Sequence, residues 1–214
     1  VSTLPEAPLY LVANEFFDAL PIRQFRRDAE GWREHMVGVQ GDTLVLGLSA
    51  PAPIALLDDR LADTKPGDIV EHCPALPAIV QTISAKIEAH GGAALIIDYG
   101  DWHSQGDTLQ AVQNHSPANP FANPGLADLT AHVDFEAIAK AALSFSRVTQ
   151  QGVFLERLGI TARARALAQG LTGDALEAHI GAHRRLTHPD EMGRLFKVIG
   201  LCPTKGPAPP GLDP

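Results

Sequence analysis

Two apolar runs of the sequence, 9–13 and 93–97, each end in polar side chains that could do chemistry. Those side chains are Asn14, Glu15 and Asp18 after the first run, and Asp98 and Tyr99 after the second. Fully apolar runs of this length are typical of strands buried on both faces of a parallel sheet. The carboxyl ends of such strands form the ligand-binding edge, so the sequence predicts a cleft lined by carboxylates. That cleft suits a cation or a hydroxyl donor. The alternative is a pair of capped strand ends that bind no ligand.

A third group of chemically capable side chains stands in residues 127–135, just before an expected helix. Its members are Asp128, Thr130, His132 and Asp134. Histidine is the usual general base near neutral pH, so His132 is the candidate base of this group. The alternative for Thr130 and Asp134 is plain capping of the helix that follows.

Metal-binding and nucleophile motifs are not supported, and we predict no metal site. His179 and His183 lie four residues apart and share a helix face, but no H-E-x-x-H pattern accompanies them. A zinc site needs more ligands than these two. Cys73 has no second cysteine nearby and is expected to be a small core residue. No G-x-S-x-G motif indicates a serine nucleophile.

Glycine spacing sets a further limit on the chemistry. No two glycines of the chain stand two positions apart, so the G-x-G fingerprint of phosphate and nucleotide sites is missing. A sheet that has a ligand-binding edge but no glycine-rich loop is an incomplete nucleotide site.

Composition excludes several function classes. The formal net charge is −8 and no block of Lys and Arg occurs, which disfavours a broad nucleic-acid surface. No run approaches the roughly 18 apolar residues of a membrane span. No signal peptide opens the chain. The two cysteines, Cys73 and Cys202, offer no disulfide framework and favour a reducing compartment.

The elements that must position these side chains follow an α/β pattern. After the first strand, β-rich pieces at 22–27, 32–40 and 43–48 are joined by turn-forming residues. They predict an antiparallel meander over 22–48, inserted after the opening strand. Apolar residues then repeat at helical spacing over 76–87 before the run at 93–97. This strand–helix–strand succession predicts a right-handed crossover.

The second half of the chain begins with a long polar stretch, 101–134, that shows no obvious structure. A connection of this length is usually a functional lid or binding loop. Beyond it we expect helices and strands that complete the sheet. The expected helices are 135–143, 153–158, 161–169 and 173–186, and the expected strands are 145–150 and 196–201. A Pro- and Gly-rich tail, 203–214, is expected to be disordered.

Several blocks of the sequence resemble the MidA-like class I methyltransferases. The blocks are 12–21, 31–34, 91–100, 106–110, 124–135 and 192–198. They are collinear and cover nearly the whole chain, and several are long and peculiar to that family. The family includes the complex I assembly-factor protein arginine methyltransferase of mitochondria.

The resemblance implies a Rossmann-like class I methyltransferase sheet that binds S-adenosylmethionine. In that family a glycine-rich loop and a ribose-binding acid precede the region that corresponds to Val1. We therefore expect residues 1–202 to be the C-terminal part of a methyltransferase domain, with a sheet incomplete at its N-terminal side. The meander at 22–48 is then an insertion, 101–134 a lid-like loop and 203–214 the disordered tail.

The resemblance also assigns roles to the candidate residues. Those expected to contact the cofactor are Ala13, Asn14 and Phe17. Those expected to be catalytic are Glu15, Asp18 and His132. Those expected to bind the substrate are Asp98, Tyr99, Asp128 and Thr130. Paired carboxylates match a guanidinium, so catalysis would consist chiefly of positioning.

The expected function is S-adenosylmethionine-dependent methylation of an arginine in a protein substrate, such as a respiratory complex I subunit. The alternative is a non-catalytic assembly or interaction factor that keeps the fold and grips a basic partner in the acidic cleft. Cofactor binding discriminates the two. A weaker alternative is a nicotinamide-dependent oxidoreductase, which the missing G-x-G pattern neither supports nor excludes.

Expected partners and location follow from the same resemblance. The partner is a protein substrate with an exposed arginine, without nucleic acid or a membrane span, and a homodimer stays an option. The expected location is the cytoplasm of a bacterium or the mitochondrial matrix of a eukaryote.

Overall fold

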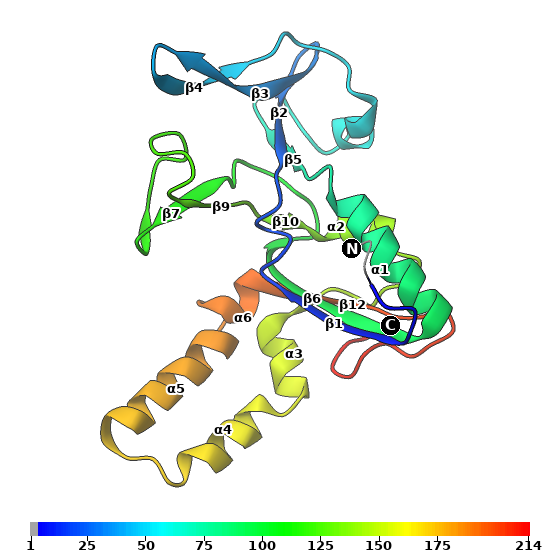
Figure 1. Cartoon of the computed structure of the whole chain (residues 1–214), viewed down its shortest axis with the longest axis vertical. Coiled ribbons are helices and arrows are strands. Elements are labelled where there is room, and N and C mark those ends of the chain that lie inside the picture. Colours follow the sequence, from blue (N-terminus) through cyan, green and yellow to red (C-terminus); the bar gives the residue numbers. More distant parts are fainter. Residues whose placement is uncertain (1–3) are drawn as a thin grey trace.

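The computed structural model describes residues 4–214 and places a mixed sheet at the centre of the fold. Its strands are β1 (Leu9–Asn14), β6 (Gly92–Asp101), β12 (Phe196–Leu201) and β11 (Thr149–Gln150), in the order β1-β6-β12-β11 (Figure 1). The first two run parallel with Leu9 opposite Gly92, and β12 runs antiparallel to β6. A short strand, β10 (Val133–Asp134), pairs with the far end of β6. The predicted α/β class is confirmed.

One face of the sheet is covered by α1 (Leu76–His90) and α2 (Phe135–Ala141), which make the main core. Fully buried side chains from α1, α2, β6 and β12 meet there: Val80, Ile87, Ile96, Ile138 and Ile199. Gly92 is needed where α1 leads into β6, because a Cβ on this residue would lie 2.0 Å from the carbonyl oxygen of Leu9. Its φ of 102° is also one that glycine adopts without strain.

The prediction that β1 is buried on both faces is wrong. Side chains alternate across a strand, so Leu9, Leu11 and Ala13 reach the core while the others point the opposite way. On that second face Tyr10 is 82% exposed and Val12 is 67% exposed. Among residues 4–214, β1 is the edge strand of its sheet. An unbroken apolar run therefore does not report how many faces of a strand are covered.

The predicted antiparallel meander is confirmed and gains a fourth strand. It consists of β2 (Arg23–Asp28), β3 (Gly31–Gln40), β4 (Thr43–Leu48) and β5 (Ile69–His72), in the order β4-β3-β2-β5. Two short 3-10 helices, η1 (Ala55–Leu57) and η2 (Asp59–Leu61), lie between β4 and β5. The meander has a small core of its own, which consists of Phe25, Trp32, Leu57 and Val70.

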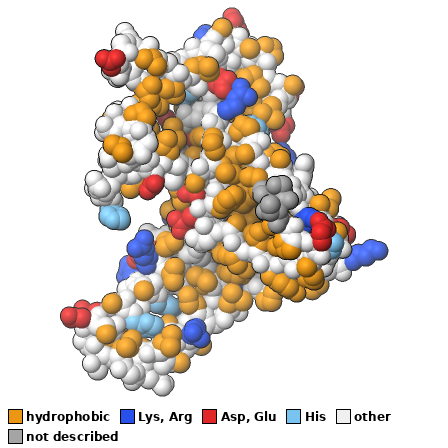
Figure 2. Space-filling model, viewed as in Figure 1, with side chains coloured by type: hydrophobic (Ala, Val, Ile, Leu, Met, Phe, Trp, Pro, Cys, Tyr) orange, Lys and Arg blue, Asp and Glu red, His pale blue; other side chains and the backbone are white. Residues whose placement is uncertain are grey.

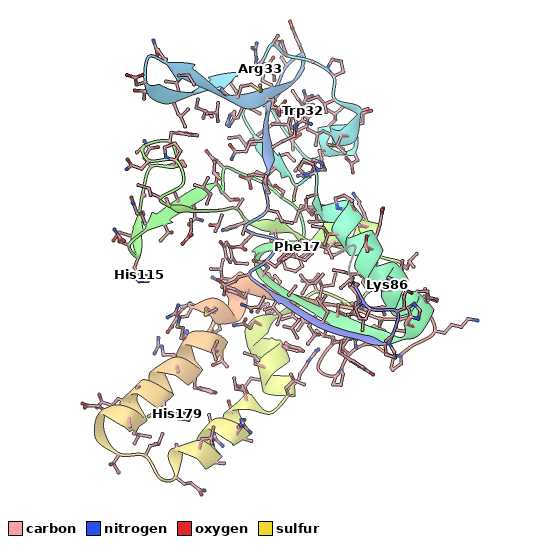
Figure 3. All side chains as sticks on the ribbon, in the orientation of Figure 1. Phe17, Trp32, Arg33, Lys86, His115 and His179 are labelled. Atoms are coloured by element: carbon pink, nitrogen blue, oxygen red, sulfur yellow. The ribbon has the colours of Figure 1, made fainter. Side chains whose placement is uncertain are left out.

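The sequence suggested that the stretch 101–134 lacks regular structure, but the structure shows three strands in it. It holds β7 (Gln110–Gln113), β8 (Ser116–Pro117) and β9 (Asp128–Thr130), paired antiparallel in the order β8-β7-β9. Asn114 and His115 join the first two strands with φ values of 51° and 61°. Two successive positive φ values are the mark of a type I′ hairpin turn, for which Asn-Gly is the usual signal. We call these three strands and the turns that join them the β7–β9 lobe. His115 stands at its outer tip (Figure 3).

The expectation of a disordered tail over 203–214 is also wrong. Leu212 is buried against Phe154 and Val198. The carbonyl oxygen of Asp213 accepts a hydrogen bond of 2.9 Å from the backbone N–H of Arg147. Proline and glycine therefore shape an irregular but packed segment here, because one leucine anchors it. The strand expected over 145–150 is reduced to β11 and an isolated bridge between Phe145 and Leu201.

The C-terminal helices are α3 (Gln151–Arg157), α4 (Ile160–Ala168), α5 (Gly173–Thr187) and the short α6 (Met192–Leu195), which the sequence did not predict. In Figure 1 α4 and α5 form a hairpin that projects away from the sheet, and neither helix buries any residue fully. His179 lies between them, with its Nε2 2.9 Å from the carbonyl oxygen of Ala164 (Figure 3). His183 lies 2.9 Å from the Thr161 hydroxyl. Both histidines thus join the two helices.

No helix in the described part of the chain combines the length and apolar character needed to cross a membrane.

Candidate active site

The parallel pairing of β1 with β6 brings the two polar strand ends together. The carboxylate of Asp98, the β6 residue just past the last one paired with β1, is fully buried and faces the loop that follows β1. Its Oδ2 accepts hydrogen bonds from the backbone N–H groups of Phe17 at 3.1 Å and Asp18 at 3.3 Å. Its Oδ1 accepts one of 3.0 Å from the N–H of Tyr99. Asp98 therefore fixes the path of the chain between β1 and the meander. Phe17, which lies on this path, is labelled in Figure 3.

Asp98 is also an unusual acid. Burial, reinforced by the negative charge of Asp18, raises its pKa to about 7, although the three backbone N–H groups act in the opposite direction. The group therefore changes charge near neutral pH. Acids with strongly perturbed pKa values cluster at functional sites.

This raised pKa predicts a specific pH dependence of stability. In the unfolded chain Asp98 loses its proton near pH 4, whereas in the folded chain it keeps the proton up to about pH 7. Its protonated form thus contributes stability that is fully present below pH 4 and is lost as the pH rises through 7. In the parent protein the free energy of unfolding should fall by a few kcal/mol, as an order of magnitude, between about pH 4 and pH 7. In Asp98→Asn this fall should be absent. Urea unfolding from pH 4 to 8 measures it.

The control for this experiment is Asp128→Asn, because Asp128 is exposed on β9. Its difference curve against the parent should stay flat over the same pH range. Equal pH slopes for the parent and Asp98→Asn would contradict the assignment.

Tyr99 links Asp98 to the second acid of the site. Its hydroxyl donates a 2.6 Å hydrogen bond to Oδ2 of Asp18. Burial and this bond to Asp18 raise the pKa of Tyr99, so the phenol stays protonated and donating at neutral pH. The side chain of Asp18 is 5% exposed, and its Oδ1 is buried without a hydrogen-bond partner among residues 4–214.

Asp18 lines a cavity of about 490 Å³ between the meander and the β7–β9 lobe. The chain from Asp18 to Gln24 contributes one side, and strands β3 and β4 contribute another. The 101–134 segment closes it from the opposite direction with Leu129, Thr130 and neighbouring residues. Figure 2 shows hydrophobic side chains gathered where β4 and this lobe face each other.

The predicted cofactor residues, Ala13, Asn14 and Phe17, and the predicted catalytic Glu15 do not line this cavity. Asn14 and Glu15 are exposed at the end of β1, where the Asn14 amide donates a 3.1 Å hydrogen bond to the Glu15 carboxylate. Glu15 adopts a φ of 49°, a left-handed conformation that costs a non-glycine residue energy and often occurs at functional sites. Ala13 and Phe17 contribute their side chains to the core.

His132 lies near the acids but faces elsewhere. Its ring packs edge-on against Tyr99 at a centroid distance of 5.5 Å, and it lines a separate open cleft of about 1030 Å³. Asp128 is exposed on β9 and is not brought to the acids. Asp134 does cap α2, because its Oδ1 accepts a 3.0 Å hydrogen bond from the N–H of Ala137. The structure thus groups Asp18, Asp98 and Tyr99, and puts Thr130 on the wall beside them.

Sequence reasoning missed Glu71, on β5. This buried carboxylate accepts hydrogen bonds from the Gln24 amide at 2.8 Å, from the N–H of Thr108 at 2.9 Å and from the Thr108 hydroxyl. Its own N–H donates to the Ser104 hydroxyl at 2.9 Å. The network ties the 101–134 segment to the meander, so Glu71 holds the two sides of the cavity together. An acid in a short strand gives no sequence signal for such a role.

Among residues 4–214, no three His, Cys, Asp or Glu side chains gather as ligands of a metal ion. The polar groups that the structure brings together at the site are the carboxylates of Asp18 and Asp98, the phenol of Tyr99 and backbone N–H groups.

Comparison with known proteins identifies the family. Residues 1–153 match a family described as "Putative S-adenosyl-L-methionine-dependent methyltransferase". The chain belongs to this family. The predicted relationship to MidA-like methyltransferases is confirmed.

Among curated proteins, the chain is similar to protein arginine methyltransferase NDUFAF7, mitochondrial, from several animals. It is 35% identical to the Xenopus laevis protein over 215 residues, which cover 95% of this chain and 48% of that protein. It is 32% identical to the Homo sapiens protein over 210 residues, which cover 94% and 46%. The chain thus spans about half the length of the curated relatives it matches.

A solved structure from Burkholderia thailandensis has the same fold. That protein, described as a "COG1565 superfamily member and likely methyl transferase" and bound to S-adenosyl-homocysteine, superposes with a TM-score of 0.81 at 31% sequence identity. The match covers 99% of this chain and 58% of that chain. The predicted class of methyltransferase fold is confirmed.

Proposed function

We propose that this chain forms the substrate side of an S-adenosylmethionine-dependent protein arginine methyltransferase. The observation that carries the proposal is the buried Asp18, whose Oδ1 lacks a partner beside a cavity. An unpartnered buried carboxylate oxygen is costly, and a ligand that donates hydrogen bonds removes that cost. The names of the relatives, which are protein arginine methyltransferases, support the same substrate.

A guanidinium fits this acceptor better than an ammonium does. It is planar and presents fixed N–H donors, so a carboxylate can hold its orientation as well as its charge. Tyr99 holds Oδ2 of Asp18 by its 2.6 Å bond, which keeps the carboxylate plane fixed. Catalysis then consists of aiming one guanidinium nitrogen at the methyl group. No strong base is needed at neutral pH if the proton leaves after transfer has begun.

The cofactor would supply an electrophilic methyl group on a sulfonium. Asn14 and Glu15 are exposed at the strand end and offer an amide and a carboxylate, which fit the polar groups of such a ligand. Ala13 and Phe17 can take part only through their backbone, since their side chains belong to the core. The catalytic roles of Glu15 and His132 and the substrate-binding role of Asp128 stay predictions. The closing of residues 101–134 over the site as a lid is also a prediction. The relatives' names support a mitochondrial setting, and a complex I subunit is the substrate that the resemblance implies.

The decisive experiment incubates the gene product that contains this chain with isotopically labelled S-adenosylmethionine and a protein extract. Mass spectrometry then locates the transferred methyl group. We expect it on a guanidino nitrogen of arginine. Label on lysine or on a carboxyl group would overturn the arginine assignment. Tight cofactor binding with no transfer, to the extract or to arginine peptides, would contradict catalysis. A lack of cofactor binding would favour the assembly-factor alternative.

We also expect the 214-residue chain by itself to bind S-adenosylmethionine weakly, with a dissociation constant above roughly 1 mM. The reason is that no G-x-G turn in this chain lets the backbone approach the ligand closely. Isothermal titration calorimetry measures the affinity. Micromolar binding to the chain alone would show that these residues hold the cofactor without such a turn.

A further inference from the structure

We infer that the cavity between the meander and the β7–β9 lobe selects the substrate sequence, by accepting an apolar side chain that neighbours the cationic residue held at Asp18. This inference rests on the proposed function and deepens it. The occupant is an extended segment of a protein substrate that carries one cation and, a few residues away, one aliphatic or aromatic side chain.

The first argument is the lining of the cavity. Apolar side chains face it from both sides: Val37, Leu44 and Leu46 from β3 and β4, and Phe121 and Leu129 from the 101–134 segment. Val37 is 55% exposed, Leu46 is 49% exposed and Leu129 is 48% exposed. Apolar side chains that are exposed on facing elements of a soluble protein mark a binding surface more often than scattered ones do.

The second argument is the charge pattern. Arg23 and Glu34, which also line the cavity, pair with each other at 2.7 Å. The amide of Gln24 is engaged by Glu71 and Asp107. Among the acids that line the cavity, Asp18 therefore keeps the unpartnered oxygen. One free acceptor within apolar walls is complementary to a cation that is followed or preceded by an apolar side chain.

The third argument is size and shape. A volume of about 490 Å³ lies within the roughly 300–1,000 Å³ range of small-ligand pockets, so it admits a few side chains but no folded domain. Leu44 and Leu46 belong to β4 and Leu129 to β9, which are edge strands of their sheets among the described residues. An extended peptide can pair with a free strand edge, and alternate side chains then enter pockets.

The test uses two short fluorescent arginine peptides that differ only in flanking residues, leucine in one and serine in the other. Fluorescence anisotropy with the gene product that contains this chain gives their affinities, and methyl transfer gives kcat/KM. We expect the leucine peptide to be preferred by about tenfold to one hundredfold in both, because it buries one aliphatic side chain. The double variant Val37→Ser with Leu46→Ser should reduce this ratio to within about threefold of unity.

Val39→Ser is the matched control. Val39 lies two residues from Val37 on the same strand and is 73% exposed, but it does not line the cavity. This variant should keep the parental preference and the parental melting temperature.

The outcomes separate the inference from the proposed function. A leucine preference in binding that the double variant abolishes supports the inference even if no methyl group is transferred. Methyl transfer to both peptides at equal kcat/KM overturns the inference and leaves the function in place. Self-association of the chain that Val37→Ser weakens would assign the cavity to a second copy and overturn the inference too. A variant that melts well below the parent is replaced by Leu129→Ser, on the opposite wall, with the same expected loss.

Discussion

Replacing Asp18 by asparagine is expected to lower methyl transfer by about one to two orders of magnitude. A charge-assisted hydrogen bond contributes about 1.5–3 kcal/mol, and each 1.4 kcal/mol lost from the transition state slows the reaction about tenfold. The bond must tighten as the guanidinium is aimed, since only interactions stronger in the transition state accelerate the reaction. Asparagine keeps an oxygen for the Tyr99 hydroxyl, so the fold should survive. Initial rates with labelled S-adenosylmethionine measure the effect.

The matched control for Asp18→Asn is Asp42→Asn, in the exposed turn between β3 and β4. It makes the same chemical change far from the site and should leave both rate and melting temperature unaltered. Glu15→Gln tests the second predicted carboxylate in the same assay. Parental rates for both Asp18→Asn and Glu15→Gln would show that these acids only cap strand ends. The functional weight would then pass to Asp98, Asp128 and His132.

Glu71→Gln is expected to lower the free energy of unfolding by about 2–4 kcal/mol. The Glu71 carboxylate accepts from the Gln24 amide, the N–H of Thr108 and the Thr108 hydroxyl. Glutamine can keep one oxygen for the Gln24 amide and the N–H of Thr108, but loss of the charge weakens both bonds, and its NH2 must donate to the Thr108 hydroxyl, which donated to the carboxylate before. Urea unfolding measures the change in stability.

A local readout accompanies that measurement. Amide exchange over 101–134 should accelerate more in Glu71→Gln than exchange in β6, because the network holds this segment to the meander. Glu30→Gln, in the exposed turn between β2 and β3, is the matched control. If Glu71→Gln left both the stability and the exchange of 101–134 at parental values, Glu71 would not fasten the cavity walls.

The meeting of the two polar segments could be predicted from sequence because it follows from short-range rules, although β6 extends to Asp101 instead of ending at residue 97. Apolar runs give strands, parallel strands share a carboxyl edge, and Asp18, Asp98 and Tyr99 therefore had to approach each other. Their individual roles could not be predicted in this way. Glu15 was expected to be catalytic and is exposed, whereas Asp98 was expected to bind substrate and is buried, where it accepts hydrogen bonds from backbone N–H groups.

The wrong predictions for β1 and the tail, and the failure to find Glu71, share a physical cause. Local composition does not show which distant residues will pack against a segment. Tyr10 and Val12 are as apolar as core residues, yet nothing among residues 4–214 covers their face. Leu212 is one apolar residue among prolines and glycines, and it packs against Phe154 and Val198 while Asp213 bonds to Arg147. Glu71 became central only because Gln24 and Thr108, far apart in sequence, both reach it.

The bonds from Phe17 and Asp18 to Asp98 have a consequence for the order of folding. They close loops of 81 and 80 residues, and loop-closure entropy delays such distant pairings. Between these ends, β3 and β4 are joined by the turn Gly41-Asp42, and such a hairpin can form within microseconds. The meander therefore gains its shape early, with Trp32 in its core, while the acids meet only when β1 docks on β6. In a Trp102→Phe background, Trp32 fluorescence should therefore recover in refolding before the Asp18–Asp98 pairing forms and any ligand can bind there.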